Sequence, residues 1–127
     1  MSYSMTDLAH QEITEQIIGA AFEVYKHLGH GFLESVYRNA MLMELRLRGL
    51  AACDEEPIEV SYKGSVIGQF KADLLVENCV IVELKIAKEY QPLDEPQLLN
   101  ELKATGIKVG LLINFGKSKV AFKRFVY

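Results

Sequence analysis

Three charged residues interrupt two apolar segments near the middle of the chain. Asp73 lies within residues 72–76, and Glu83 and Lys85 lie within residues 80–85. Alternate residues of a strand point to opposite faces, so two strands joined by a tight turn would place Asp73 opposite Glu83. Like charges in that position are destabilising unless something neutralises them. A divalent metal ion would neutralise the pair, and Lys85 would lie on the same face. This pattern is the outline of a metal-dependent phosphodiesterase site.

The predicted hairpin has a definite register. On its apolar face the pairs are Val76 with Val80, Leu74 with Val82, and Ala72 with Leu84. On the other face, Asp73 pairs with Glu83 and Lys71 with Lys85. A plainer arrangement remains open, because the two lysines could neutralise the two carboxylates through diagonal salt bridges without any metal ion.

Composition restricts the class of protein. A chain of 127 residues is long enough for one domain with a proper core, and we expect a single domain over residues 1–127. Half of the residues are apolar and 24% are charged, which is typical of soluble globular proteins. No apolar run approaches the roughly 18–20 residues that span a bilayer. The N-terminus lacks a basic-then-apolar signal pattern, so we expect a cytoplasmic protein without membrane contact.

The charges are unevenly distributed along the chain. The formal net charge is −3, yet no acidic residue follows Glu101. The basic residues beyond that point are Lys103, Lys108, Lys117, Lys119, Lys123 and Arg124. A basic edge beside an acidic metal site would suit a phosphate backbone, and we select Lys103, Lys117 and Lys119 as candidate substrate contacts. Solvated lysines on a surface hairpin explain the same pattern equally well.

The hydrophobic periodicity predicts which elements hold these residues. Apolar residues recur at helical spacing over 13–28 and 33–48, and the period then changes to two over 58–87. Asp94, followed by a proline and Gln97, marks the start of a further helix. Two apolar strands follow that helix. The order is ααβββαββ, an α+β fold with one central mixed sheet flanked by helices, in which the strands around the last helix run parallel.

Several sequence blocks together resemble a known family. The segment from Gly31 to Tyr37 has the form of the G-x-x-E-x-x-Y signature. The other matching blocks are residues 72–76, 81–85, 97–100, 102–106 and 109–116. From about Ile13 to Val126 the chain therefore resembles the GxxExxY proteins, which are similar to the PD-(D/E)XK nuclease superfamily.

This resemblance implies a fold and a set of site residues. The fold is a restriction-endonuclease-like core with a mixed sheet between helices. Asp73 would be the motif aspartate, and Glu83 with Lys85 would form the E-x-K element. Glu34 would be the additional metal-site carboxylate. Gln97 would be the polar residue at the start of the following helix.

Two positions depart from the pattern of the relatives. The RecB-like branch has a tyrosine four residues after the glutamine, where this chain has Glu101. Relatives often have a histidine shortly before the glutamine, where this chain has Asp94. Both changes leave the metal ligands in place. They bear on substrate contact, because an extra carboxylate near a phosphate would repel it.

The implied residues fit phosphodiester hydrolysis. Asp73, Glu83 and Glu34 offer the hard oxygen ligands that Mg²⁺ or Mn²⁺ prefers. Lys85 could orient or deprotonate the attacking water or neutralise developing charge, and Gln97 would position a neighbouring group.

Three residues also have plainer explanations. Tyr37, one helical turn beyond Glu34, could hold that carboxylate or stack on a base, or it could be a core residue. The helix dipole favours Glu34 in a first turn regardless of function. Gln97 could form a capping box with Asp94.

The sequence therefore predicts a Mg²⁺-dependent nuclease that acts on nucleic acid, DNA more than RNA. The alternative is a catalytically silent nuclease fold that binds nucleic acid or protein. The small size, the net acidity and Glu101 near the proposed groove support that alternative. A homodimer also stays open, since an apolar patch on the first helix would favour one.

Overall fold

The computed structural model describes residues 5–127 of the chain, with side chains from residue 10 onward. The elements are α1 (Met5–Leu28), α2 (Glu34–Leu47), β1 (Ala52–Tyr62), β2 (Ser65–Val76), β3 (Val80–Lys85), α3 (Glu95–Thr105), β4 (Val109–Phe115) and β5 (Val120–Val126). A short 3-10 turn, η1 (Pro92–Asp94), leads into α3. This order confirms the predicted ααβββαββ arrangement. The first helix and the first strand both begin earlier than predicted.

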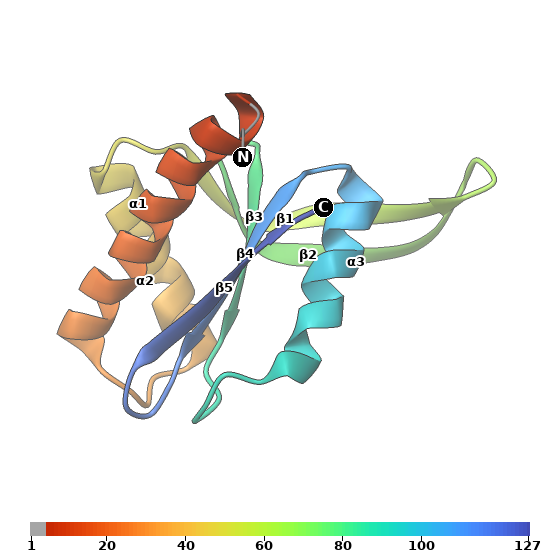
Figure 1. Cartoon of the computed structure of the whole chain (residues 1–127). Helices are drawn as coiled ribbons and strands as arrows, with labels where there is room; N and C mark the ends of the chain where they lie inside the picture. The colour runs from red at the N-terminus through yellow and green to blue at the C-terminus, as the bar shows by residue number, and fades with distance from the viewer. Residues whose placement is uncertain (1–4) are drawn as a thin grey trace.

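The five strands form one mixed sheet in the order β1-β2-β3-β4-β5. Neighbouring strands are antiparallel except for β3 and β4, which run parallel as predicted. Their connection passes through α3, which lies on one face of the sheet, while α1 and α2 cover the other (Figure 1). The α+β fold is therefore three-layered, and the ends of β3 and β4 that follow Lys85 and Asn114 lie at the same edge.

The larger core lies between the sheet and the pair α1–α2. Ile17 and Val24 on α1, and Tyr37 and Met41 on α2, are buried there at helical spacing. All seven residues of β4 are buried, because helices cover both faces of this strand. The Tyr37 ring stacks on Phe115 of β4 with the ring centroids 4.5 Å apart. These contacts hold α2 firmly against the central strands.

A smaller core lies beneath α3. Leu98 and Leu102 are fully buried against Ile81 of β3 and Leu112 of β4. The contact is close because Gly110 has no side chain: a Cβ there would lie 2.8 Å from Leu98 Cδ1. Packing therefore fixes the distance between α3 and the strands that carry the candidate site.

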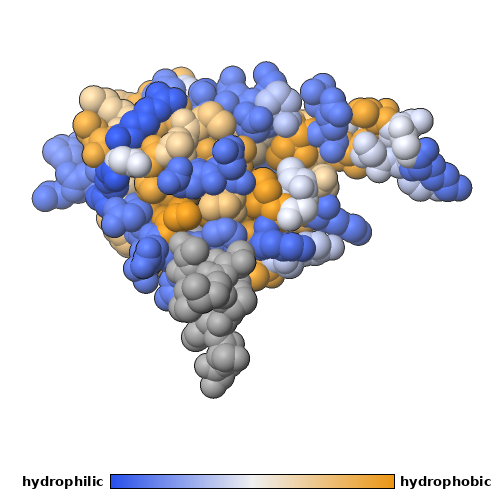
Figure 2. Space-filling view, turned by 90° about the horizontal axis from the view of Figure 1, so that it is seen from above, coloured by the Kyte–Doolittle hydropathy of each residue, from blue (hydrophilic) through white to orange (hydrophobic). Residues whose placement is uncertain are grey.

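The β1–β2 hairpin extends beyond the body of the protein (Figure 1). Its outer part exposes Tyr62, Val66 and Ile67, each more than half accessible to solvent. Seen from above, the projecting arm carries hydrophobic side chains along its length and hydrophilic ones at its tip (Figure 2). Among the described helices, none is long and apolar enough to cross a membrane.

The predicted register of the β2–β3 hairpin is correct at its turn and wrong farther along. Val76–Val80, Leu75–Ile81 and Leu74–Val82 pair as expected, but the described pairing ends at Leu74–Val82. Ala72 packs in the core beneath α3, and not beside Leu84 on the opposite side of the sheet. The two strands separate at Asp73. The β1 residue across from it, Glu55, has a left-handed φ of 51° and interrupts the β1–β2 pairing.

Candidate active site

The fork between β2 and β3 is held by side chains in place of a backbone ladder. The backbone N–H of Leu84 donates to Asp73 Oδ2 at 2.8 Å, and the backbone N–H of Asp73 donates to Glu83 Oε1 at 3.3 Å. Because carboxylates have taken these donors, Asp73 and Glu83 lie beside each other without forming a paired rung. The predicted proximity of the two acids is present, with a different physical cause.

Gln97 connects the acids to Lys85. Its side chain accepts a hydrogen bond from Lys85 Nζ at 3.1 Å. Its Nε2 donates to Glu83 Oε2 at 3.5 Å and to Glu101 Oε2 at 3.3 Å. The proposed capping box is absent, since Asp94 makes no side-chain cap at the start of α3. Gln97 instead reaches across to β3, and the amide holds one cation and two carboxyl groups in one array.

Glu34 approaches the fork from the other face of the sheet. It is the first residue of α2, and its carboxyl group lies within hydrogen-bonding reach of Asp73. Burial and the nearby Asp73 charge raise the pKa of Glu34 from its ordinary 4.5 to about 7, against the opposing influence of Lys85 and Arg38. The helix dipole alone would lower the pKa. The crowding of acids is therefore the stronger influence on Glu34.

Glu83 and Glu101 form the buried part of this acid cluster. Their exposed fractions are 2% and 0%. Burial, followed by contact with Glu101 and Asp73, raises the pKa of Glu83 far above its ordinary value. Burial also raises the pKa of Glu101, although hydrogen bonds from its neighbours partly offset this. Burial therefore shifts both carboxyl groups toward their protonated forms.

The donor chemistry of the cluster suits a hard divalent cation. Glu34, Asp73, Glu83 and Glu101 supply carboxylate oxygens, and Glu101 Oε1 is buried without a hydrogen-bond partner in the described residues. As the side chains lie, no three His, Cys, Asp or Glu residues of the described chain are spaced as a ready metal cage. The carboxyl groups instead contact one another and the backbone. Carboxylate oxygens are suitable ligands for Mg²⁺ or Mn²⁺. In this structure, however, the carboxyl groups are arranged to form hydrogen bonds and do not surround a cation position.

The salt-bridge alternative is not the arrangement found. None of the ion pairs within residues 10–127 joins Lys71 or Lys85 to Asp73 or Glu83. Lys71 is exposed, and the hydrogen bond of Lys85 goes to Gln97. The acids therefore remain without direct neutralisation by a lysine.

The prediction that Tyr37 contacts substrate is wrong. Its side chain is fully buried, and its hydroxyl donates to the backbone oxygen of Gly29. It stacks on Phe115, and Phe32 packs against its edge. A ring with no exposed surface cannot stack on a base, so the core explanation of Tyr37 holds. Tyr37 helps to position Glu34 by anchoring the first turns of α2.

The basic residues are more dispersed than one continuous edge. Lys117 and Lys119 lie in the β4–β5 turn, where the Lys117 N–H donates to the Lys88 carbonyl at 3.0 Å. This turn lies at the sheet edge that follows Lys85. Lys103 lies farther along α3, beside the β1–β2 hairpin. Lys123 is exposed and pairs with Glu95.

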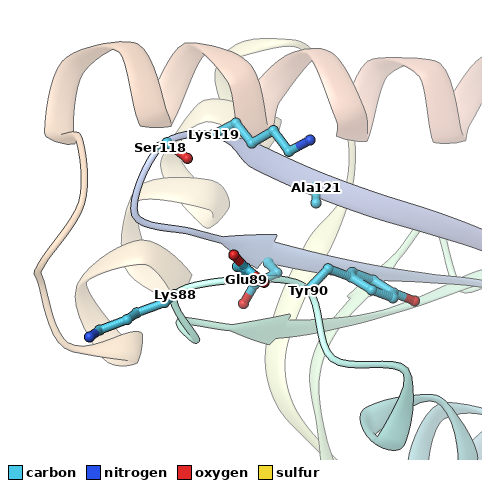
Figure 3. Close-up of a pocket in the computed structure, with 7 residues that line it drawn as sticks. Lys88, Glu89, Tyr90, Ser118, Lys119 and Ala121 are labelled. Atoms are coloured by element: carbon cyan, nitrogen blue, oxygen red, sulfur yellow. The ribbon is translucent and has the colours of Figure 1, made fainter.

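A pocket of about 460 Å³ lies beside the β4–β5 turn (Figure 3). The amino groups of Lys88 and Lys119 point in opposite directions there, and Glu89 lies between them. These groups do not converge on one point, so the pocket lacks the geometry of a phosphate cradle.

Asn114 is a site-supporting residue that the sequence analysis missed. It is 2% exposed, accepts a hydrogen bond from the Ala87 N–H and donates to the Ala87 carbonyl, both at 2.9 Å. This two-point contact fixes the chain just after Lys85. The available signal was an amide at the end of a strand of buried apolar residues, because such an amide requires partners.

Of the comparisons with known proteins, the family model supports the fold class. A family model described as the PD-(D/E)XK nuclease superfamily matches residues 11–125. No curated protein matches the chain. Among solved structures, the chain is similar to one titled "Crystal structure of SSO0001", with 19% sequence identity and a TM-score of 0.48. That match covers 90% of this chain and 77% of the other.

Proposed function

Because the chain belongs to the PD-(D/E)XK nuclease superfamily, we propose that it is a metal-dependent nuclease that hydrolyses phosphodiester bonds in DNA. Within that superfamily we propose that it is a GxxExxY protein, on the basis of the segment from Gly31 to Tyr37. Membership favours the fold more strongly than the reaction, so the site must support the chemistry independently.

The observation that carries the proposal is the β2–β3 fork. Backbone donors orient Asp73 and Glu83, Glu34 meets them from α2, and Gln97 holds Lys85 beside them. A purely structural sheet would gain nothing from clustering acids where two strands separate, because burying carboxyl groups together is costly. Such a cost is typical of a site kept for function.

Asp73, Glu83 and Glu34 are the residues that would hold Mg²⁺ or Mn²⁺. A bound divalent ion supplies charge neutralisation at the phosphate and activates a water molecule. Lys85 is held by a hydrogen bond to Gln97, so its ammonium is placed to orient the nucleophile or to stabilise developing charge. Gln97 contacts both the acid and the lysine, which suits a positioning role.

The α3 side of the sheet has a groove that would suit a nucleic-acid strand. A groove of about 590 Å³ lies between α3 and the β1–β2 hairpin, and Phe70, Asn100 and Lys103 line it. An aromatic ring beside a cationic and an amide side chain suits a single strand. Lys117 and Lys119 would contact the backbone beyond Lys85. We propose these three lysines as substrate contacts.

A cleavage assay tests the proposal. The wild-type protein is incubated with single-stranded, duplex and branched DNA and with RNA, in Mg²⁺, in Mn²⁺ and in EDTA. The expected result is metal-dependent cleavage of DNA that Asp73→Asn strongly reduces and Glu89→Gln leaves intact. Glu89 is an exposed carboxylate outside the cluster, so its variant controls for the loss of one charge. Absence of cleavage of every substrate, in Mg²⁺ and in Mn²⁺, would contradict the proposal.

A second candidate is a silent nuclease fold that binds nucleic acid without cutting it. The observation that favours it is the hydrogen-bonded acid cluster, in which no described set of three ligands forms a ready metal cage. Saturable binding of labelled DNA in EDTA, with no cleavage in either metal, would identify this function. Lys103→Ala would then weaken binding and reduce its salt dependence.

A homodimer is a further part of the proposal. Phe22 on α1 is 50% exposed and contacts Phe122 of β5, itself 44% exposed, with the ring centroids 6.2 Å apart. Two exposed aromatic rings on one face would be covered in a symmetric dimer. Sedimentation analysis of wild type and Phe22→Ser tests this, and a wild-type monomer at all concentrations would contradict it.

A further inference from the structure

Glu101 is the buried acid for which the superfamily pattern provides no role. Its side chain is completely buried, one helical turn after Gln97 on the face of α3 that meets β3. Oε2 accepts a hydrogen bond from Gln97. Oε1 is buried and has no donor within the described part of the chain. Its carboxyl group contacts that of Glu83.

An unpartnered buried carboxylate oxygen requires an explanation. Leaving such an atom without a donor is unfavourable, and an apolar side chain at this position would remove the penalty. Leu98 and Leu102 show that this face of α3 accepts apolar residues readily. The chain nevertheless directs the carboxyl group of Glu101 at that of Glu83, and no ion pair within residues 10–127 joins Glu101 to a lysine or arginine.

The neighbouring cations do not supply that partner. The hydrogen bond of Lys85 goes to the Gln97 carbonyl oxygen, and Lys85 forms no ion pair with Glu101. Arg38 is within 3.6 Å of Asp54 and 3.5 Å of Glu55 on β1. The two N–H groups of the Gln97 amide go to Oε2 of Glu83 and Oε2 of Glu101. A small cation that accepts hard oxygen ligands would satisfy Glu101 Oε1 and the facing carboxyl group together.

We propose that Glu101 is a further metal ligand, which with Glu83 binds a divalent cation on the α3 side of the fork. This inference rests on the proposed function and extends it. The site would hold Mg²⁺ or Mn²⁺ through four carboxylates instead of three. The acid that replaces the RecB-like tyrosine would then alter the metal centre. As a metal ligand, the Glu101 carboxylate would not have to contact the substrate phosphate directly.

Calorimetric titration with Mn²⁺ alone, without nucleic acid, tests the role of Glu101. The proteins are the wild type, Glu101→Gln, Glu101→Asp and the charge-matched control Glu89→Gln. We expect Glu101→Gln to weaken Mn²⁺ binding by at least tenfold or to remove one bound ion. Glu101→Asp should retain part of the affinity because it keeps the charge, and the control should match wild type. Circular dichroism verifies that each variant is folded.

Two results would overturn the inference, and they differ in what they say of the proposed function. Unchanged or tighter Mn²⁺ binding by folded Glu101→Gln would show that Glu101 is not a ligand, while loss of binding in Asp73→Asn would leave the nuclease proposal standing. Absence of Mn²⁺ binding by wild type at millimolar concentration would also overturn it, and the cleavage assay would then decide the nuclease proposal separately.

Discussion

Strand β3 has two edges that behave differently. Toward β4 it pairs over its whole length, from Val80–Val109 to Lys85–Asn114. Toward β2 its pairing ends at Leu74–Val82, and side chains take over the hydrogen bonds beyond that point. The edge of β3 that faces β4, the fixed edge, holds the strand in place. The edge that faces β2, the open edge, carries the acidic side chains of the candidate site. The comparison shows how one buried strand can stabilise the sheet and also position the side chains of an active site.

Breaking the fixed edge should have the largest effect. Phe115→Ala removes the ring that stacks on Tyr37 and leaves a cavity behind α2. We expect the free energy of unfolding to fall by about 3–5 kcal/mol. Urea denaturation monitored by circular dichroism measures the change. Phe122→Ala, at a 44% exposed ring, is the matched control and should cost less than about 1.5 kcal/mol.

Breaking the open edge should destroy activity and leave the fold intact. Asp73→Asn removes a charge at the fork but keeps a side-chain oxygen that can accept from the Leu84 N–H. We expect cleavage to fall by roughly 10²–10³-fold, the scale seen when one key electrostatic group is lost. Single-turnover assays measure it. Wild-type cleavage rates in this variant would contradict the role of Asp73.

The open edge should also make stability depend on pH. A raised carboxyl pKa means that the folded state holds the proton more tightly than the unfolded state. The resulting stabilisation is complete below the ordinary pKa of 4.5 and is lost as pH rises through the folded-state pKa, about 7 for Glu34 and higher for Glu83. In EDTA, unfolding free energy should therefore fall from pH 5 to pH 8.

Glu83→Gln sharpens that prediction, because an amide cannot ionise. We expect this variant to be more stable than wild type at pH 8 by roughly 1–3 kcal/mol, with a smaller difference at pH 5. Urea denaturation at both pH values measures the difference. Parallel pH profiles for the two proteins would show that the fork does not raise the pKa of Glu83.

The smallest effect should come from Gln97, which connects Lys85 to the acids of the fork. Gln97→Leu removes the hydrogen bonds to Lys85, Glu83 and Glu101 without adding charge. We expect roughly a 10-fold loss of cleavage, typical of a group that orients a ligand or catalytic residue. Gln91→Leu, at an exposed glutamine whose amide donates to the backbone oxygen of Glu89, is the control. A change in KM alone would indicate substrate binding in place of positioning.

Much of the fold could be predicted from the sequence because its signals are local. The alternation of apolar and polar residues predicted strands β2 and β3, and glycines indicated where helices end. The fork could not be predicted in this way. Alternation assumes that backbone groups pair with backbone groups, whereas the Leu84 N–H pairs with the Asp73 side chain. Spacing therefore brought Asp73 near Glu83 but also extended the ladder too far.

The candidate site was predictable in part for a similar reason. Motif spacing selected Asp73, Glu83 and Lys85, and the structure brings these together with Gln97. Tyr37 was misjudged because sharing a helix face with Glu34 does not decide which residue the sheet covers. The burial of Glu101 likewise depends on how closely α3 packs on β3, which periodicity along one helix does not reveal.

The parallel edge of β3 has a consequence for how the chain folds. Val80 pairs with Val109, so this edge closes only after the intervening chain, including α3, has been arranged. Closing such a long loop loses chain entropy before its contacts form, which slows folding relative to a hairpin. The antiparallel turn at Asn78 can form early and locally. The acidic half of the site would therefore be present on a nascent chain before Gln97 and Asn114 arrive to order it.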